Sequence, residues 1–194
     1  GATVYIDRGD EPVDTLLRRI IAEQGHLDIL VNCVCGEYEH MVENGDFAAS
    51  YAASRLVAKT MAAQHSGLIV HIPFWAGQQH GQQHTDESAR ANLKVATEWA
   101  TTDMAQALRE YNVAVVSLYP GVLSTESVLQ SADLFGLSDS GSPQFVGRAV
   151  AALAADPNLL ENSGRSFDAA QLAQEYKFTD VDGERPKSPP LDTA

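Results

Sequence analysis

The chain has 194 residues, of which 44% are hydrophobic and 20% are charged, and this is the composition of a globular protein, not a disordered one. Acidic residues number 26 against 13 basic ones, and the formal net charge of -13 makes nucleic acids and anionic membrane surfaces poor partners. No apolar run approaches the ~18 residues of a membrane span. The length predicts one domain, residues 1–179, and the polar, proline-containing residues 180–194 are predicted to form a tail.

Strand and helix patterns alternate along the chain. In order, the predicted elements are a strand at 3–6, a helix beginning at Pro12, a strand at 27–31, a helix at 47–64, a strand at 67–72, a helix at 87–110, a strand at 113–119, a helix at 143–156 and a weaker strand at 165–167. The segments 27–31 and 67–72 are nearly continuous apolar runs, which is typical of strands buried on both faces of a parallel sheet. The alternation predicts an α/β fold with about five strands and helices on both faces.

Ligands of open α/β sheets bind at the carboxyl ends of the strands. In this chain those ends are residues 32–36, 73–77 and 120–125, so a functional site is expected to be built from these three segments.

The cysteines and histidines do not predict a metal site. A disulfide between Cys33 and Cys35 would strain the chain, and reduced thiols are typical of a cytoplasmic protein. Together with His40 these cysteines lack a second ligand pair at a recognised spacing. His80 and His84 have the spacing of a shared metal on a helix, but the Gly81 and glutamine-rich surroundings favour a loop.

Several phrases resemble the short-chain dehydrogenase/reductase family. They are Leu-Asp-Ile-Leu-Val-Asn at 27–32, Gly-Leu-Ile-Val at 67–70 and Val-Ser-Leu-Tyr-Pro-Gly at 116–121. The stretches at 156–160, 163–165, 172–176 and 180–183 look like the member 1 subgroup of the dehydrogenase/reductase proteins. The resemblance implies a Rossmann-like parallel sheet and NAD(P)(H)-linked chemistry on alcohol or carbonyl groups.

This chain departs from the family upstream of residue 27. No Gly-x-Gly-x-x-Gly turn is present, so the fold is expected to lack the family's first β-α unit. Residues 3–6 are then expected to fill the vacant sheet position beside 27–31, since two-faced burial of that strand needs a neighbour.

The family's mechanism uses a tyrosine to pass the proton, a lysine four residues later and a serine that orients the substrate oxygen. Transferred onto this sequence, the lysine is Lys94, the tyrosine position is Arg90 and the serine position is Phe74. Arginine stays protonated and cannot serve as this acid or base. Lys94 is therefore the one candidate catalytic residue, with a helix-surface lysine as the alternative.

The resemblance implies NAD or NADP as cofactor, held by Asn32, Gly36, Lys94, Pro120, Gly121 and Thr125. Pro120–Gly121 is equally an ordinary turn that ends a strand. Two functions stay open: an NAD(P)(H)-dependent oxidoreductase that is impaired or inactive as this chain, and a non-catalytic homologue that acts as a binding or oligomerisation module. A homo-oligomer is expected through the alanine-rich helices 47–64 and 87–110, because the family pairs two such helices across a dyad.

Overall fold

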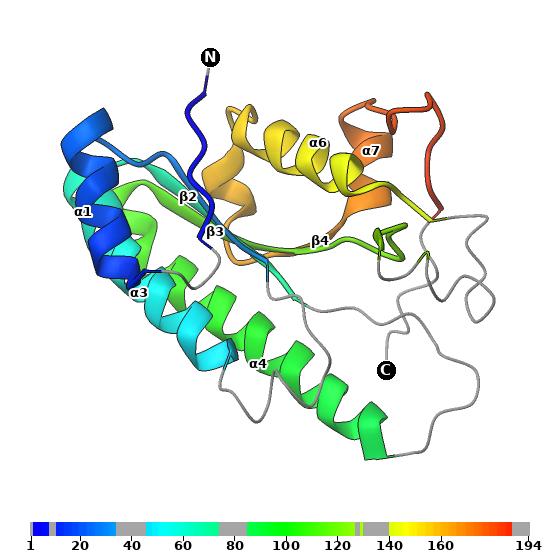
Figure 1. The fold of residues 1–194 in the computed structure, drawn as a ribbon, viewed down its shortest axis with the longest axis horizontal. Helices are drawn as coiled ribbons and strands as arrows, with labels where there is room; N and C mark the ends of the chain where they lie inside the picture. The colour runs from blue at the N-terminus through cyan, green and yellow to red at the C-terminus, as the bar shows by residue number, and fades with distance from the viewer. Residues whose placement is uncertain are drawn as a thin grey trace.

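A computed structural model of the chain describes residues 2–7, 11–33, 46–73, 85–126, 129 and 140–187. Its centre is a four-stranded parallel sheet in the order β1-β2-β3-β4 (Figure 1). The strands are β1 (Ile29–Cys33), β2 (Gly67–Ile72), β3 (Val113–Tyr119) and β4 (Ser166–Asp168). The prediction of a parallel α/β fold is confirmed, and β2 and β3 have the predicted bounds.

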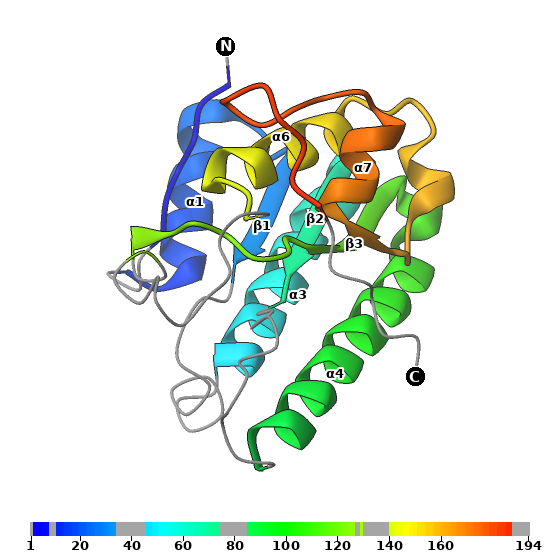
Figure 2. The same ribbon diagram turned by 90° about the vertical axis from the view of Figure 1, so that its right-hand side faces the viewer.

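Helices cover both faces of the sheet (Figures 1 and 2). One face packs against α1 (Val13–Gln24), α3 (Asp46–Gln64) and α4 (Thr85–Leu108), which continues into the 3-10 helix η1 (Arg109–Tyr111). The other face packs against α6 (Pro143–Ala154) and α7 (Ala169–Glu175). A second 3-10 helix, η4 (Leu159–Asn162), connects α6 to β4.

The side chains of β3 show how the two layers form. Val113 and Val115 join the apolar cluster under α3 and α4, whereas Val116 and Leu118 join the cluster under α6 and α7. Every residue of β3 is buried, because successive side chains of a strand point to opposite faces and both faces are covered. Each such aliphatic side chain contributes roughly 1.5–3 kcal/mol by leaving water.

The prediction of a fifth strand at 3–6 is wrong. The phenol of Tyr5 donates a hydrogen bond to Glu23 (2.6 Å) and accepts one from Gln24 (3.0 Å), so the described N-terminal segment is attached to α1 and not to the sheet. Among the described residues β1 pairs only with β2, and the side chains of Ile29 and Val31 remain 36% and 41% exposed. Val4 and Ile6 of this segment are 76% and 71% exposed, so their side chains add little to the core.

The segment after residue 179 is attached to the domain at its start. The buried carboxylate of Asp180 accepts hydrogen bonds from the backbone N–H (2.7 Å) and the hydroxyl (2.5 Å) of Ser142, which caps the start of α6. Arg148 of α6 donates to the backbone carbonyls of Thr179 and Asp180. Residues 188–194 of the predicted tail lie outside the described residues, and the domain boundary at 179 stays a prediction.

No helix in the described part of the chain combines the length and the hydropathy that a membrane crossing requires.

Candidate functional site

The predicted site residues that the structure describes lie toward the carboxyl edge of the sheet. Asn32 is in the second half of β1, and Pro120 and Gly121 directly follow β3. Lys94 lies on α4. Gly36 and Phe74 lie outside the described residues, as does the side chain of Arg90, which belongs to α4 one turn before Lys94.

Lys94 is held against the end of β3. Its ammonium nitrogen lies 5.6 Å from the ring centroid of Tyr119, the last residue of that strand. The Tyr119 hydroxyl donates a 2.8 Å hydrogen bond to the carboxylate of Glu98, which lies one helical turn after Lys94 on α4. The structure thus forms a Lys94–Glu98–Tyr119 cluster and places the lysine next to the Pro120–Gly121 turn.

Tyr119 does not replace the tyrosine that position 90 lacks. Burial raises the pKa of Tyr119 far above its usual value, and the hydrogen bond to the Glu98 carboxylate raises it further. A phenol in this state does not release its proton near neutral pH. The sequence prediction includes neither Glu98 nor Tyr119. The signal for both was spacing along the chain: Tyr119 directly precedes Pro120, and Glu98 follows Lys94 by four residues.

The side chain of Asn32 is hydrogen-bonded to α3. Its side-chain amide donates to the backbone carbonyl of Ser50 (3.2 Å) and to the hydroxyl of Ser54 (2.6 Å), both on α3. The structure therefore gives Asn32 a role in attaching β1 to α3 and does not bring its amide together with Lys94.

The segment after β3 forms a fixed turn. Gly121 has a φ of 72°, in the left-handed region that favours glycine, and it redirects the chain at the strand end. The following residues are held by hydrogen bonds with Gly141, to whose carbonyl the Ser124 N–H donates at 2.8 Å. Thr125, the last predicted residue of this group, is half-buried in the same segment.

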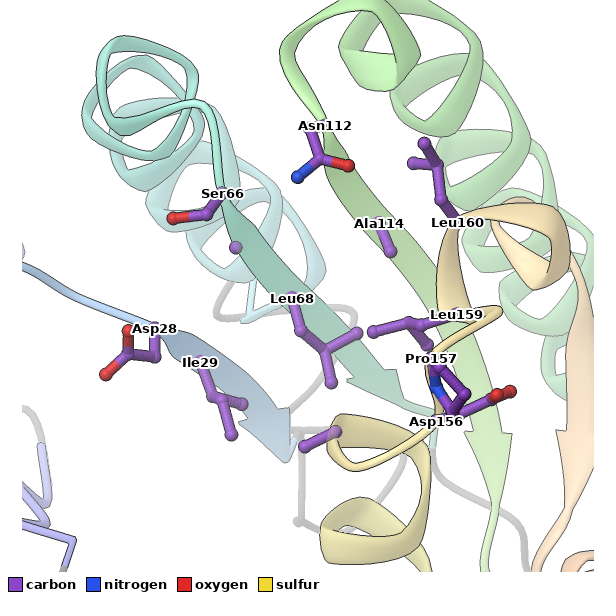
Figure 3. Close-up of a pocket in the computed structure, with 12 residues that line it drawn as sticks. Asp28, Ile29, Ser66, Leu68, Asn112, Ala114, Asp156, Pro157, Leu159 and Leu160 are labelled. Atoms are coloured by element: carbon purple, nitrogen blue, oxygen red, sulfur yellow. The ribbon is translucent and has the colours of Figure 1, made fainter.

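A pocket of about 330 Å³ lies at the opposite edge of the sheet, at the amino ends of β1, β2 and β3 (Figure 3). Apolar side chains such as Leu68 and Leu159 line it together with the acidic Asp28 and Asp156, and none of the described lining residues is a lysine or an arginine. The Asp156 carboxylate already accepts hydrogen bonds from Tyr176 (2.7 Å) and Asn162 (3.0 Å), which lower its pKa. Such a lining does not suit the phosphates of a dinucleotide, so this pocket is not the cofactor site that the sequence predicts.

Metal ligands do not gather in the described ranges, where no group of three or more His, Cys, Asp or Glu side chains could hold an ion. Cys33 is described and exposed. Cys35, His40, His80 and His84 lie outside the described residues.

Related proteins span more sequence than this chain does. Dehydrogenase/reductase SDR family member 1 of Mus musculus is 29% identical over 90% of this chain and 64% of its own length. Its namesake from Homo sapiens is 29% identical over 83% of this chain and 60% of its own length. The chain therefore spans less than two thirds of the length of these relatives. A 2,3-dihydro-2,3-dihydroxybenzoate dehydrogenase of Bacillus subtilis (strain 168) is 32% identical over 63% of this chain and 49% of its own length.

Solved structures share the fold at low identity. An NAD+-bound xylitol dehydrogenase superposes with a TM-score of 0.62 at 18% identity, over 80% of this chain and 72% of that one. Acetoin dehydrogenase YohF from Salmonella typhimurium gives 0.61 at 19% identity, over 85% and 72%. The family model described as short chain dehydrogenase matches residues 6–133, which is more than half of the chain. The chain belongs to the short-chain dehydrogenase family.

Proposed function

We propose that this chain is a relative of the NAD(P)(H)-dependent oxidoreductases of alcohol and carbonyl groups, and that its turnover by the tyrosine mechanism is strongly impaired. The observation that carries the proposal is the pair of positions on α4: Lys94 is retained at the carboxyl edge of β3, whereas the proton-donor position one turn earlier is Arg90. A guanidinium keeps its proton at every relevant pH, so it cannot cycle one with a substrate oxygen. General acid–base help of this kind is typically worth about 10²–10⁴-fold in rate.

Of the residues predicted to hold a nicotinamide cofactor, Lys94 fits that role and Asn32 does not. Lys94 supplies an ammonium donor that suits ribose hydroxyls, and NAD(P)(H) would supply the hydride of the family's chemistry. Asn32 does not fit, because its amide is already used by Ser50 and Ser54. Weak cofactor binding that depends on Lys94 is therefore expected, with NAD and NADP equally open.

Calorimetry with NADH and NADPH, followed by a panel of carbonyl substrates, tests the proposal. We expect no measurable oxidation of either cofactor and weak binding that Lys94→Ala abolishes. Lys59→Ala is the matched control, because Lys59 is an exposed lysine on the neighbouring helix α3. Robust turnover by the unmodified chain, particularly turnover lost in Lys94→Ala, would overturn the proposal.

Self-association is the second candidate function, and α4 carries the observation that favours it. Val95 and Trp99 lie one turn apart on this helix and are 63% and 71% exposed. Large apolar side chains that gather on one face of a helix are typical of protein contact sites. A second copy of this chain is the proposed partner, through α3 and α4.

Light scattering should give a dimer for the unmodified chain and a monomer for Trp99→Glu, whereas the control Tyr111→Glu should leave the dimer intact. A monomer at micromolar concentration in the unmodified chain contradicts this candidate.

A further inference from the structure

A row of polar side chains crosses β1, β2 and β3 beneath α3 and α4. Asn32 of β1, His71 of β2 and Ser117 of β3 are register partners on adjacent strands. Ser54 of α3 and Thr101 of α4 complete the set, which is here called the polar row. Ser54, Thr101 and Ser117 are fully buried, and His71 is nearly so. Such a set in a core must satisfy its own hydrogen bonds.

The imidazole of His71 connects both helices to the sheet. Its Nε2 lies 3.0 Å from the Ser54 hydroxyl, and its Nδ1 lies 2.9 Å from the Thr101 hydroxyl. The Ser54 hydroxyl also lies 3.0 Å from the backbone carbonyl of Ser50, and it accepts from Asn32 at 2.6 Å. The Thr101 hydroxyl lies 2.8 Å from the carbonyl of Thr97 and 2.7 Å from the Ser117 hydroxyl.

These contacts need one more proton than the three hydroxyls and a neutral imidazole can supply together. Five contacts require a hydroxyl or ring proton: Ser54 with Ser50, Ser54 with His71, His71 with Thr101, Thr101 with Thr97, and Thr101 with Ser117. The three hydroxyls and one ring N–H of a neutral imidazole supply four protons, and an imidazolium supplies five. The neutral polar row therefore leaves one contact without its proton.

The neighbouring hydrogen bonds determine which of the five contacts lacks a proton when His71 is neutral. If Nδ1 carries the proton, Ser54 donates to Nε2, and the Ser50 carbonyl still accepts from Asn32 (3.2 Å). If Nε2 carries it, Thr101 must donate to Nδ1, and the Thr97 carbonyl loses its hydroxyl donor. The first arrangement keeps more hydrogen bonds, so the neutral ring is expected as the Nδ1–H tautomer.

Among the described residues, no negatively charged side chain contacts the His71 ring, so a protonated ring would have no counter-charge. The polar groups that face His71 are Asn32 from β1, Ser117 from β3, Ser54 from α3, and Thr101 with Thr97 from α4, and all are uncharged. The charged side chains of Lys94 and Glu98, on the same helix as Thr97 and Thr101, each contact Tyr119. Burial consequently lowers the pKa of His71 to about 4.

We propose that the polar row is an acid-sensitive latch that holds α3 and α4 on the sheet while His71 is neutral. Acid adds a proton at Nε2. This proton would complete the five contacts, but the described residues around the ring are uncharged and burial disfavours the charged form, so the charged ring is more stable in an opened arrangement in which water reaches it. With a pKa of 6.5 in water and about 4 in the closed fold, openings that expose His71 become roughly 60-fold more frequent between pH 7 and pH 4.5. The proposal concerns the attachment of two helices and does not depend on cofactor binding or turnover.

Hydrogen exchange of the full chain, corrected for intrinsic pH effects, tests the latch. Amides of α3 and α4 that pack over His71 should lose about 60-fold in protection between pH 7 and pH 4.5, and the loss should be absent in His71→Gln. His26→Gln is the matched control, because this exposed histidine lies outside the polar row. An equal pH response in the unmodified chain and in His71→Gln would overturn the proposal, whatever the stability of the variant.

Nitrogen NMR of the imidazole provides the second measurement. At pH 7 the ring should be the Nδ1–H tautomer, and its pKa should lie well below the 6.5 of an imidazole in water. Thr101→Val removes the acceptor at Nδ1 and should switch the ring to the Nε2–H tautomer, whereas Ser54→Ala should leave it as Nδ1–H. An Nε2–H ring in the unmodified chain, or a pKa of His71 near 6.5, contradicts the proposed proton arrangement.

Discussion

Asp180 attaches the last described segment to the start of α6, and Asp180→Asn measures what this attachment contributes. The buried carboxylate, 5% exposed, accepts from the N–H and hydroxyl of Ser142 and from the N–H of Val181. Asparagine has the same shape, but it replaces one acceptor oxygen with an NH₂ donor. One of the two Ser142 donors would then face another donor.

The expected loss follows from the kind of bond removed. Hydrogen bonds to a charged group are worth about 1.5–3 kcal/mol, and leaving a buried donor unsatisfied adds to the cost. We expect the free energy of unfolding to fall by about 2–3 kcal/mol. At roughly 2–4 °C per kcal/mol for a chain of this size, Tm should fall by about 4–12 °C.

The pH dependence of the loss gives an independent check. Burial raises the pKa of Asp180, but the hydrogen bonds from Ser142 and Val181 and the charge of Arg148 outweigh it, and the net pKa lies below the usual 3.8. A carboxyl whose pKa is lowered by folding stabilises the fold above its unfolded pKa, and this contribution disappears as the pH falls through the folded pKa. The difference between the unmodified chain and Asp180→Asn should therefore be full at pH 7 and shrink below pH 3.8.

Urea denaturation of both proteins, with Asp182→Asn as control, measures the effect. Asp182 lies two residues further on and is exposed, so its replacement removes the same charge without a buried bond. A loss in Asp180→Asn that does not exceed the loss in Asp182→Asn would refute the reasoning.

Three further predictions concern the core and the candidate site. Gly67→Ala would place a Cβ 2.5 Å from the sulfur of the buried Met61 and should cost about 1–3 kcal/mol in urea denaturation, whereas Gly147→Ala, with open space at its Cβ on α6, should not destabilise. Tyr119→Phe removes the donor to Glu98 but keeps the ring beside Lys94, so it should cost about 1 kcal/mol and Tyr119→Leu should cost more. His71 has a pKa of about 4 in the fold and 6.5 in water, so its contribution to the free energy of unfolding is full above pH 6.5 and falls by about 3 kcal/mol toward pH 4. An acid titration of stability whose slope is the same in His71→Gln would contradict this last prediction.

The central strands of the sheet could be predicted because a continuous apolar run in the sequence indicates a strand that is buried on both faces. The segments 67–72 and 113–119 are apolar on both faces except at His71 and Ser117, and they form β2 and β3 with the predicted bounds. Residues 3–6 have the same β-branched character, yet composition does not tell which neighbour a segment will contact. In the structure Tyr5 contacts Glu23 and Gln24 of α1, and these contacts depend on how α1 folds back beside the N-terminal segment.

The candidate site was predictable only where it depends on spacing along the chain. The spacing to Pro120 along the chain identifies Lys94, whereas the contact of Lys94 with Tyr119 depends on how α4 packs against β3. The sequence predicts that Asn32 holds a cofactor, but the packing of α3 on β1 turns its amide toward Ser54. Contacts of this kind depend on tertiary structure, which a single sequence does not reveal.

The polar row also determines how the strands align. An apolar strand such as β2 can slide along its neighbours at little cost, because its hydrophobic pattern is nearly the same on both faces. A slip of one residue would turn His71 into the apolar cluster under α6 and α7, where a ring that needs two polar partners would be unsatisfied. A slip of two residues would carry it about 7 Å along the strand, out of reach of Ser54 and Thr101. The buried histidine thus selects one register of the parallel sheet over its near alternatives.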